Sequence, residues 1–290
     1  MNKILITGAT GNLGKAVANE LIAKGVTNVS VMARDLQKAE EFKAKGVEVV
    51  YGDYNDYDSL VKAFTNVDTL YFVSASDVTQ RYTQQENVVK AAAEAGVKHI
   101  IYTSAQRKRE DGTSVIAFVI EADLHTEALI KESGMTYTIL KHGLYAELLP
   151  LFMGESVIET GVVYLPAGMG KAAYISRNDL AIAGATIITT EGHENKTYEF
   201  GGATAYSFQD IADMLTELSG KTIEYVNPTA EEFAQQMKEY GLTNEEIDEA
   251  AGFCIAIAQD EFDFPSPTVE QLIGRPTTSI KDFLKKTYTL

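Results

Sequence analysis

The sequence has almost no cysteine and comparatively few basic residues, and each shortage limits what the protein can be. Its single cysteine, Cys254, allows no intrachain disulfide among 290 residues, which favours a cytoplasmic protein. Lys and Arg number 25 against 41 Asp and Glu, so the formal net charge is −16. Because that charge repels phosphate groups, we expect neither nucleic acid nor an anionic membrane as a main partner.

Long apolar runs and leader-like segments are also missing. No run of about 20 apolar residues is present, so we expect no transmembrane helix. The first strand-like stretch starts at Lys3, without a basic region and an apolar signal segment ahead of it. A chain of 290 residues fits one large α/β domain, or a nucleotide-binding domain with a smaller lobe.

A glycine-rich turn near the N-terminus is the most informative stretch. The apolar residues 3–6 read as a buried strand before it, and Leu13, Val17 and Leu21 follow it at helical spacing. In such a strand–turn–helix unit the backbone can approach a pyrophosphate, and the helix N-terminus faces the phosphates. The expected cofactor-binding residues of the turn are Gly8, Thr10, Gly11, Asn12, Leu13 and Gly14.

Each glycine of the turn has its own expected purpose. Gly8 allows the tight turn, and Gly14 lets the helix pack closely on the strand. Gly11 gives the pyrophosphate access to the backbone, and we also expect a backbone conformation there that valine resists.

Apolar strands and helices then alternate up to about residue 145. The expected strands are residues 29–33, 47–51, 69–73, 99–103 and 137–140, with helices at 36–45, 56–64, 81–95 and 122–133 between them. Strict βα alternation predicts an α/β fold, a Rossmann-type doubly wound parallel sheet.

The second half of the sequence alternates less regularly. Helices are expected at 178–190 and 207–219 and from residues 229, 243 and 279, with a strand at 197–200 and an irregular stretch at 265–276. We therefore expect a dinucleotide-binding domain at 1–145. A smaller, mostly helical substrate lobe would follow at 146–290 and partly return to the sheet.

Ligands of doubly wound sheets bind beyond the carboxyl ends of the strands, so the residues that follow the strands should converge on one cleft. The cofactor-binding candidates there are Arg34, Asp53, Ser74, Ala75, Ser76, Thr103, Lys141 and Gly143.

Arg34 directly follows the second strand, where NAD-dependent proteins place an acidic residue for the ribose hydroxyls. A cation at that position can instead pair with a 2′-phosphate, which favours NADP(H) over NAD(H). The neighbouring Asp35 is the competing ribose ligand, and a solvated surface arginine is the third interpretation.

The sequence resembles the atypical, NmrA-like branch of the short-chain dehydrogenase/reductase superfamily. The resemblance is carried by Gly-Ala-Thr-Gly-Asn-Leu-Gly at 8–14, Ser-Ala-Ser at 74–76, Tyr-Thr-Ser at 102–104, residues 137–145 and Ile-Gly-Arg-Pro-Thr-Thr-Ser at 273–279. It implies an NAD(P)H-dependent quinone reductase. Such proteins commonly carry Arg-Asn-Gly or Arg-Pro-Gly where this chain has Lys141-His142-Gly143.

Mainstream members of the superfamily use a Tyr-x-x-x-Lys pair as proton donor. Tyr137 and Lys141 match its spacing, yet Tyr137 opens an expected strand, whereas the motif needs a helix that puts both residues on one face. We therefore expect an enzyme without this pair. A quinone can accept a hydride and collect its proton from solvent, whereas a ketone needs a positioned donor.

His142 lies at the expected cleft and is the candidate catalytic residue, orienting or protonating the acceptor; a neutral histidine bonded to backbone is the alternative. Tyr82 and Tyr145 are the candidate substrate residues, and the sequence leaves the role of Lys171 open. The histidine spacing indicates no metal site.

These patterns predict hydride transfer from NADPH to a quinone or similar small electrophilic acceptor. A non-catalytic NADP(H)-binding redox sensor that acts through a protein partner is the alternative. The sequence leaves the acceptor open, and also whether the chain forms a homodimer.

Overall fold

The computed structural model describes residues 2–290, which form two compact units of three segments each. The first unit comprises the chain up to Ala105, Phe118–His142 and Arg177–Tyr198. The second comprises Gln106–Ala117, Gly143–Ser176 and Glu199–Leu290. The domain boundary expected between residues 145 and 146 stays a prediction.

A seven-stranded sheet dominates the molecule, in the order β3-β2-β1-β4-β5-β6-β8. Strand β1 pairs in parallel with β2 and β4, and the pairs β2–β3, β4–β5 and β5–β6 are parallel too. The bounds are β1 Ile4–Ile6, β2 Val29–Ala33, β3 Glu48–Tyr51, β4 Thr69–Phe72, β5 His99–Ala105, β6 Thr136–His142 and β8 Lys196–Phe200. The α/β doubly wound fold is confirmed, and its strand order reverses between β1 and β4.

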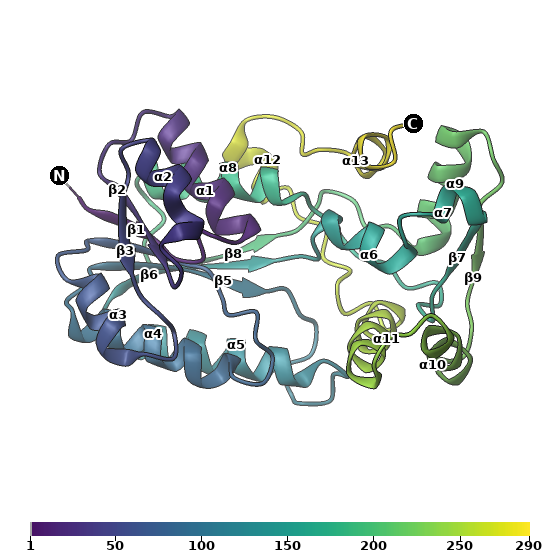
Figure 1. Cartoon of the computed structure of the whole chain (residues 1–290), viewed down its shortest axis with the longest axis horizontal. Coiled ribbons are helices and arrows are strands. Elements are labelled where there is room, and N and C mark those ends of the chain that lie inside the picture. The colour runs from purple at the N-terminus through teal and green to yellow at the C-terminus, as the bar shows by residue number, and fades with distance from the viewer. Residues whose placement is uncertain (1) are drawn as a thin grey trace. The chain divides into compact units, whose positions relative to one another are not determined.

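Helices cover both faces of this sheet (Figure 1). One face carries α1, α2 and α8, and the other carries α3, α4 and α5. The bounds are α1 Asn12–Ala23, α2 Glu40–Ala44 after the short helix η1 Gln37–Ala39, α3 Tyr57–Phe64, α4 Arg81–Glu94, α5 Ala117–Glu132 and α8 Arg177–Thr189. Helix α5 starts five residues before the expected residue 122.

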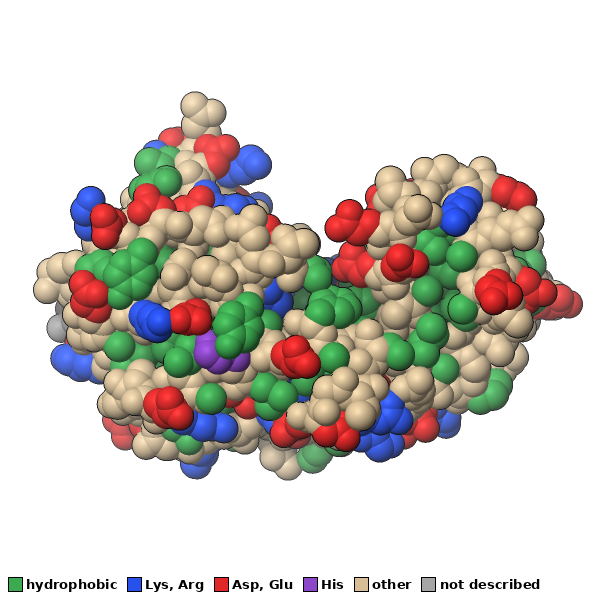
Figure 2. All heavy atoms as spheres, turned by 90° about the horizontal axis from the view of Figure 1, so that it is seen from below, with side chains coloured by type: hydrophobic (Ala, Val, Ile, Leu, Met, Phe, Trp, Pro, Cys, Tyr) green, Lys and Arg blue, Asp and Glu red, His purple; other side chains and the backbone are tan. Residues whose placement is uncertain are grey.

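Acidic side chains are spread across the face shown in Figure 2, interspersed with basic ones and with apolar patches. This distribution matches the net charge of −16. A phosphate-bearing ligand therefore needs local positive groups.

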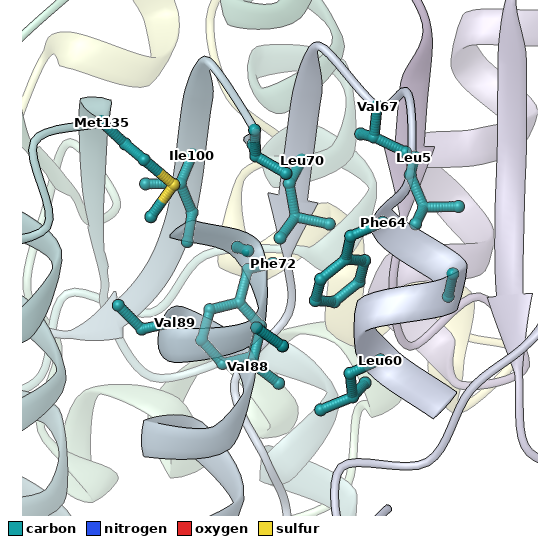
Figure 3. Close-up of a cluster of buried hydrophobic side chains, with 14 of the residues drawn as sticks. Leu5, Leu60, Phe64, Val67, Leu70, Phe72, Val88, Val89, Ile100 and Met135 are labelled. Atoms are coloured by element: carbon teal, nitrogen blue, oxygen red, sulfur yellow. The ribbon is translucent and has the colours of Figure 1, made fainter. Parts of the chain in front are cut away.

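One hydrophobic cluster of the first unit lies between the sheet and the helices α3 and α4 (Figure 3). Leu5, Leu70, Phe72 and Ile100 project from neighbouring strands because alternate strand residues face the same side. They pack on helix residues spaced three or four apart, which are Leu60, Phe64, Val88, Val89 and Ala92. This packing fixes the carboxyl ends of β1, β4 and β5 relative to one another.

The second unit contains a two-stranded parallel sheet and helices of different lengths, from the three-residue η2 to the 15-residue α11. Its elements are η2 Ala146–Leu148, α6 Leu149–Met153, α7 Val157–Thr160, β7 Val162–Tyr164, α9 Phe208–Ser219, β9 Glu224–Val226, α10 Ala230–Glu239, α11 Asn244–Ala258, α12 Thr268–Ile273 and α13 Ile280–Thr287. Helices α9, α10 and α11 start at capping boxes on Ser207, Thr229 and Thr243, as expected. The expectation of an irregular stretch at 265–276 was wrong, because α12 lies within it.

No helix among the described residues combines the length and the apolar character needed to cross a bilayer.

Candidate functional site

Two glycines of the turn between β1 and α1 are explained by sterics alone. Gly8 has φ +60°, and a Cβ on it would lie 3.0 Å from the Cβ of Val73. A Cβ on Gly14 would lie 2.5 Å from the carbonyl oxygens of Thr7 and Gly8. The expected tight turn and close helix packing are therefore both present.

Gly11 differs from the expectation made for its backbone. It is the N-cap of α1 with φ −95° and ψ −179°, an extended conformation that any residue adopts. A Cβ there would contact only the Gly8 carbonyl oxygen, at 3.3 Å. The predicted backbone restriction was wrong, and what distinguishes Gly11 is the absence of a side chain at an exposed tip.

The tip of the turn is suited to an anion. Thr10, Gly11 and Asn12 are exposed, whereas Leu13 and Gly14 are buried beneath them. No side chain among the described residues caps the N-terminus of α1, so the amides of its first turn point outward from the positive end of the helix dipole. A pyrophosphate fits this arrangement.

A hydrogen-bonded link that the sequence did not reveal ties the turn to the end of β4. The Thr7 hydroxyl accepts a hydrogen bond from the Val73 amide at 3.0 Å and lies 2.6 Å from the Tyr54 hydroxyl. Tyr54 in turn donates to the Val73 carbonyl at 2.7 Å. Burial raises the pKa of Tyr54, which therefore remains a neutral donor. Thus β1 and β4 are held together where the strand order reverses.

The expected cofactor residues after β4 are held in place by neighbouring side chains. The Ser74 amide donates to Thr103 Oγ1 at 2.9 Å. The Ala75 amide donates to Gln85 Oε1 at 3.2 Å, and Arg81 donates to the Ala75 carbonyl. Ser76 is exposed. Ser74, Ala75 and Thr103 therefore lie together at the carboxyl ends of β4 and β5.

Arg34 is exposed and is the first residue after β2, as the sequence indicated. The pKa of Asp77 is lowered chiefly by the Thr79 hydroxyl and more weakly by the charge of Arg34. One oxygen of the competing Asp35, Oδ1, accepts the Gln37 amide at 2.9 Å. Of the two side chains, the guanidinium carries the positive charge that attracts a phosphate.

Asp53 follows β3, as expected, and stabilises its own turn. Its Oδ1 accepts the Asn55 amide at 3.0 Å, and its amide donates to Ser59 Oγ at 3.0 Å.

Strand β6 continues two residues past its expected end, so Lys141 and His142 are strand residues, paired in register with Ser104 and Ala105 of β5. His142 is only 4% exposed, and burial lowers its pKa to about 3. Its imidazole is therefore neutral at physiological pH and a poor proton donor, as in the alternative of a neutral histidine. Its expected contact with the acceptor stays a prediction.

Gly143 follows β6 and has a packing reason to be glycine. A Cβ on it would lie 2.8 Å from Gln106 Oε1 and 2.9 Å from the Ala173 carbonyl oxygen. Its expected contribution to a cofactor site stays a prediction.

The two candidate substrate tyrosines lie in different units. Tyr82, on α4, is 47% exposed, and its ring stacks on His125 with centroids 4.0 Å apart and 12° between the planes. Tyr145 precedes η2 in the second unit and bridges to Ile175 through its backbone. Lys171, in the same unit, donates its amide to Asp260 Oδ1 at 3.0 Å.

Among the described residues, no group of three or more His, Cys, Asp or Glu side chains is arranged to hold a metal ion. Cys254 is fully buried on α11, and burial raises the pKa of its thiol to about 12.

A glycine turn at the point where the strand order reverses, leading into a helix without a side-chain cap, defines a Rossmann-type dinucleotide-binding protein. Within that class, the chain belongs to the NmrA-like family, whose model matches residues 1–281.

Relatives of known activity match nearly the whole chain. It is 36% identical over 280 residues to quinone oxidoreductase 2 of Escherichia coli, covering 96% of each chain. It is 29% identical over 283 residues to an NAD(P)H azoreductase of Xenophilus azovorans, covering 97% of this chain and 96% of the relative. The crystal structure of Citrobacter sp. triphenylmethane reductase complexed with NADP(H) superposes with a TM-score of 0.90 at 36% identity, covering 98% of this chain and 99% of that one.

Proposed function

We propose that the protein is an NADPH-dependent oxidoreductase that transfers a hydride to a quinone or a similar small electrophilic acceptor. The observation that carries the proposal is the exposed tip of the glycine turn, Thr10–Asn12, in front of the uncapped N-terminus of α1. Family membership and the named relatives support it, since quinone, azo and triphenylmethane reductases all act on conjugated acceptors.

The preference for NADPH rests on Arg34. Its guanidinium is exposed beside the end of β2, and the competing carboxylate of Asp35 is bonded to the Gln37 amide. Planar guanidinium groups bind phosphate oxygens through paired, charge-assisted hydrogen bonds. The relative solved with NADP(H) supports the same preference.

When bound, NADPH supplies the hydride. The protein holds it through the amides of the turn, through Arg34 and through the segment 74–76 after β4. Asp53, Thr103, Lys141 and Gly143 belong to the same proposed set, at the carboxyl ends of β3, β5 and β6. Tyr82 and Tyr145 are proposed to contact the acceptor.

We propose that transfer needs no Tyr-x-x-x-Lys pair. Tyr137 and Lys141 both lie on β6, where a rise of roughly 3.3 Å per residue puts positions four apart about 13 Å from each other. On a helix the corresponding side chains lie within about 6 Å. His142, kept neutral by burial, orients the acceptor rather than protonating it, and the reduced acceptor takes its proton from water.

The test is NADPH oxidation by the purified protein with a panel of quinones, azo dyes and triphenylmethane dyes, with NADH in parallel. We expect turnover with at least one of these classes and faster oxidation of NADPH than of NADH. Tight NADPH binding without turnover on the whole panel would instead support the redox-sensor alternative.

Two further proposals concern the state of the protein in cells. The single buried cysteine supports a cytoplasmic location. A homodimer, which the sequence left open, is the second proposal. Sedimentation equilibrium checks the second proposal, and a monomer at all concentrations would contradict it.

A further inference from the structure

A buried polar cluster in the first unit lies next to the segment after β4. At its centre is Asp123 of α5, which is 0% exposed. Its Oδ1 accepts hydrogen bonds from Tyr102 at 2.7 Å, from Arg81 at 2.7 and 3.2 Å, and from Gln85 at 3.4 Å. One carboxylate oxygen thus gathers donors from β5 and α4.

Two of these donors hold the backbone of one residue. Gln85 accepts the Ala75 amide at 3.2 Å, and Arg81 donates to the Ala75 carbonyl. Both backbone polar groups of Ala75 are therefore fixed by side chains that contact Asp123. Arg81 has Asp123 as its ion-pair partner, whereas Gln85 Nε2 also donates to Thr126 Oγ1 at 2.9 Å. The adjacent Ser74 amide is held independently, by Thr103 at 2.9 Å.

Stability alone is a weak explanation for such a cluster. Removing a carboxylate and a guanidinium from water costs free energy that their attraction offsets only in part, and well-packed apolar residues often serve equally well. Moreover, Asp123 Oδ2 is buried and makes no hydrogen bond within the described part of the chain. What this geometry supplies is a fixed direction for the Arg81 guanidinium, whose planar fork admits few orientations.

We propose that Asp123 is a positioning residue which, through Arg81 and Gln85, holds the segment 74–76 in the conformation that binds the cofactor. The inference rests on the proposed function, in which that segment contacts NADPH. Asp123 itself touches neither cofactor nor acceptor. Its loss should therefore weaken cofactor binding while leaving the reaction of the bound state largely intact.

Asp123→Asn is the main variant, and Glu127→Gln is its matched control. Glu127 is also a buried carboxylate on α5, and it accepts a hydrogen bond at 2.6 Å from Ser104, which is not one of the residues that hold Ala75. For Asp123→Asn we expect the Kd and KM for NADPH to rise about tenfold with kcat changed less than twofold. For Glu127→Gln we expect the Kd and the KM for NADPH to stay within twofold of the wild-type values, even if the protein melts at a lower temperature.

Amide hydrogen exchange of the protein without cofactor is the second measurement. In Asp123→Asn the Ala75 amide should exchange about tenfold faster, whereas the Ser74 amide should keep its rate because its partner is Thr103. If Asp123→Asn does not fold, Arg81→Lys tests the same link, since lysine lacks the planar fork.

Unchanged exchange at Ala75, or equal effects of Asp123→Asn and Glu127→Gln on NADPH affinity, would overturn the proposal. A failure of the wild type to bind NADPH would refute the proposed function instead. The two failures are distinguishable because the exchange measurement needs no cofactor.

Discussion

At the scale of single residues, the sequence identified side chains that stand next to a recognisable motif and missed those that act through distant contacts. Arg34 was proposed as a cofactor ligand because it directly follows a strand. Tyr54 and Asp123 were missed because their partners, Thr7 and Arg81, are remote in sequence. Asp and Arg are also mostly exposed in folded proteins, so nothing in the residue types indicated a buried pair.

Replacing Arg34 should change the choice of cofactor rather than binding in general. Hydrogen bonds to a charged group contribute roughly 1.5–3 kcal/mol each, so Arg34→Ala should weaken NADPH binding at least tenfold. NADH lacks the 2′-phosphate and should lose little. Arg34→Asp should go further, because it repels the phosphate and offers NADH a ribose ligand. Titrating both cofactors against the three proteins measures the ratio of affinities.

If both affinities fell together, Arg34 would not bind the 2′-phosphate. The control for that outcome is Asp35→Ala, which tests the competing carboxylate. Under the present assignment this variant should leave the affinity ratio unchanged.

At the scale of elements, strands β1–β6 were predicted well and β7 and β9 were not. The former are rich in apolar residues, and the glycines that end the helices before β2, β3, β5 and β6 all have positive φ; they are Gly25, Gly46, Gly96 and Gly134. The two short strands have three residues each, and their pairing joins positions about 60 residues apart, such as Val163 and Tyr225. Local patterns cannot reveal such pairing, which tertiary packing decides.

The turn before α1 should separate a binding defect from a folding defect. Gly11→Val should leave the fold intact, since φ at Gly11 is ordinary and a Cβ there contacts only the Gly8 carbonyl oxygen. The side chain would fill the space of the pyrophosphate, so NADPH should no longer raise the melting temperature. Gly14→Ala should instead destabilise the protein itself, because its Cβ would lie 2.5 Å from two carbonyl oxygens.

Thermal unfolding with and without NADPH checks both variants. The interpretation of the turn would be wrong if Gly11→Val kept the full stabilisation by NADPH.

Strand β6 gives a test of the proposed mechanism. Tyr137 is partly buried against the core cluster of Figure 3, so Tyr137→Phe should keep reductase activity within about twofold. A positioned proton donor contributes about 10²–10⁴-fold to a rate. A loss of that size in steady-state kinetics, with an unchanged melting temperature, would restore Tyr137 as the catalytic acid.

At the scale of the whole molecule, the buried His142 couples folding to pH. In the unfolded chain a histidine has a pKa of about 6.5, whereas burial lowers the pKa of His142 to about 3 in the folded protein. Between these values the unfolded state binds a proton that the folded state does not. Stability from this group is therefore complete above about pH 6.5 and is lost as the pH falls.

As the pH falls below about 6.5, the unfolding free energy should drop by about 1.4 kcal/mol per pH unit because of His142. His142→Gln removes the group that titrates. The unfolding free energy of the wild type minus that of the variant, measured by urea unfolding, should therefore decrease between pH 7 and pH 5 with that slope. Carboxylates titrate in both proteins and cancel in the difference. His142→Asn, equally neutral, should give the same pH dependence at a different absolute stability. Parallel plots of unfolding free energy against pH for wild type and both variants would contradict this prediction. They would mean that His142 accepts a proton in the folded protein as readily as in the unfolded chain. The imidazole would then regain the role of proton donor to the acceptor.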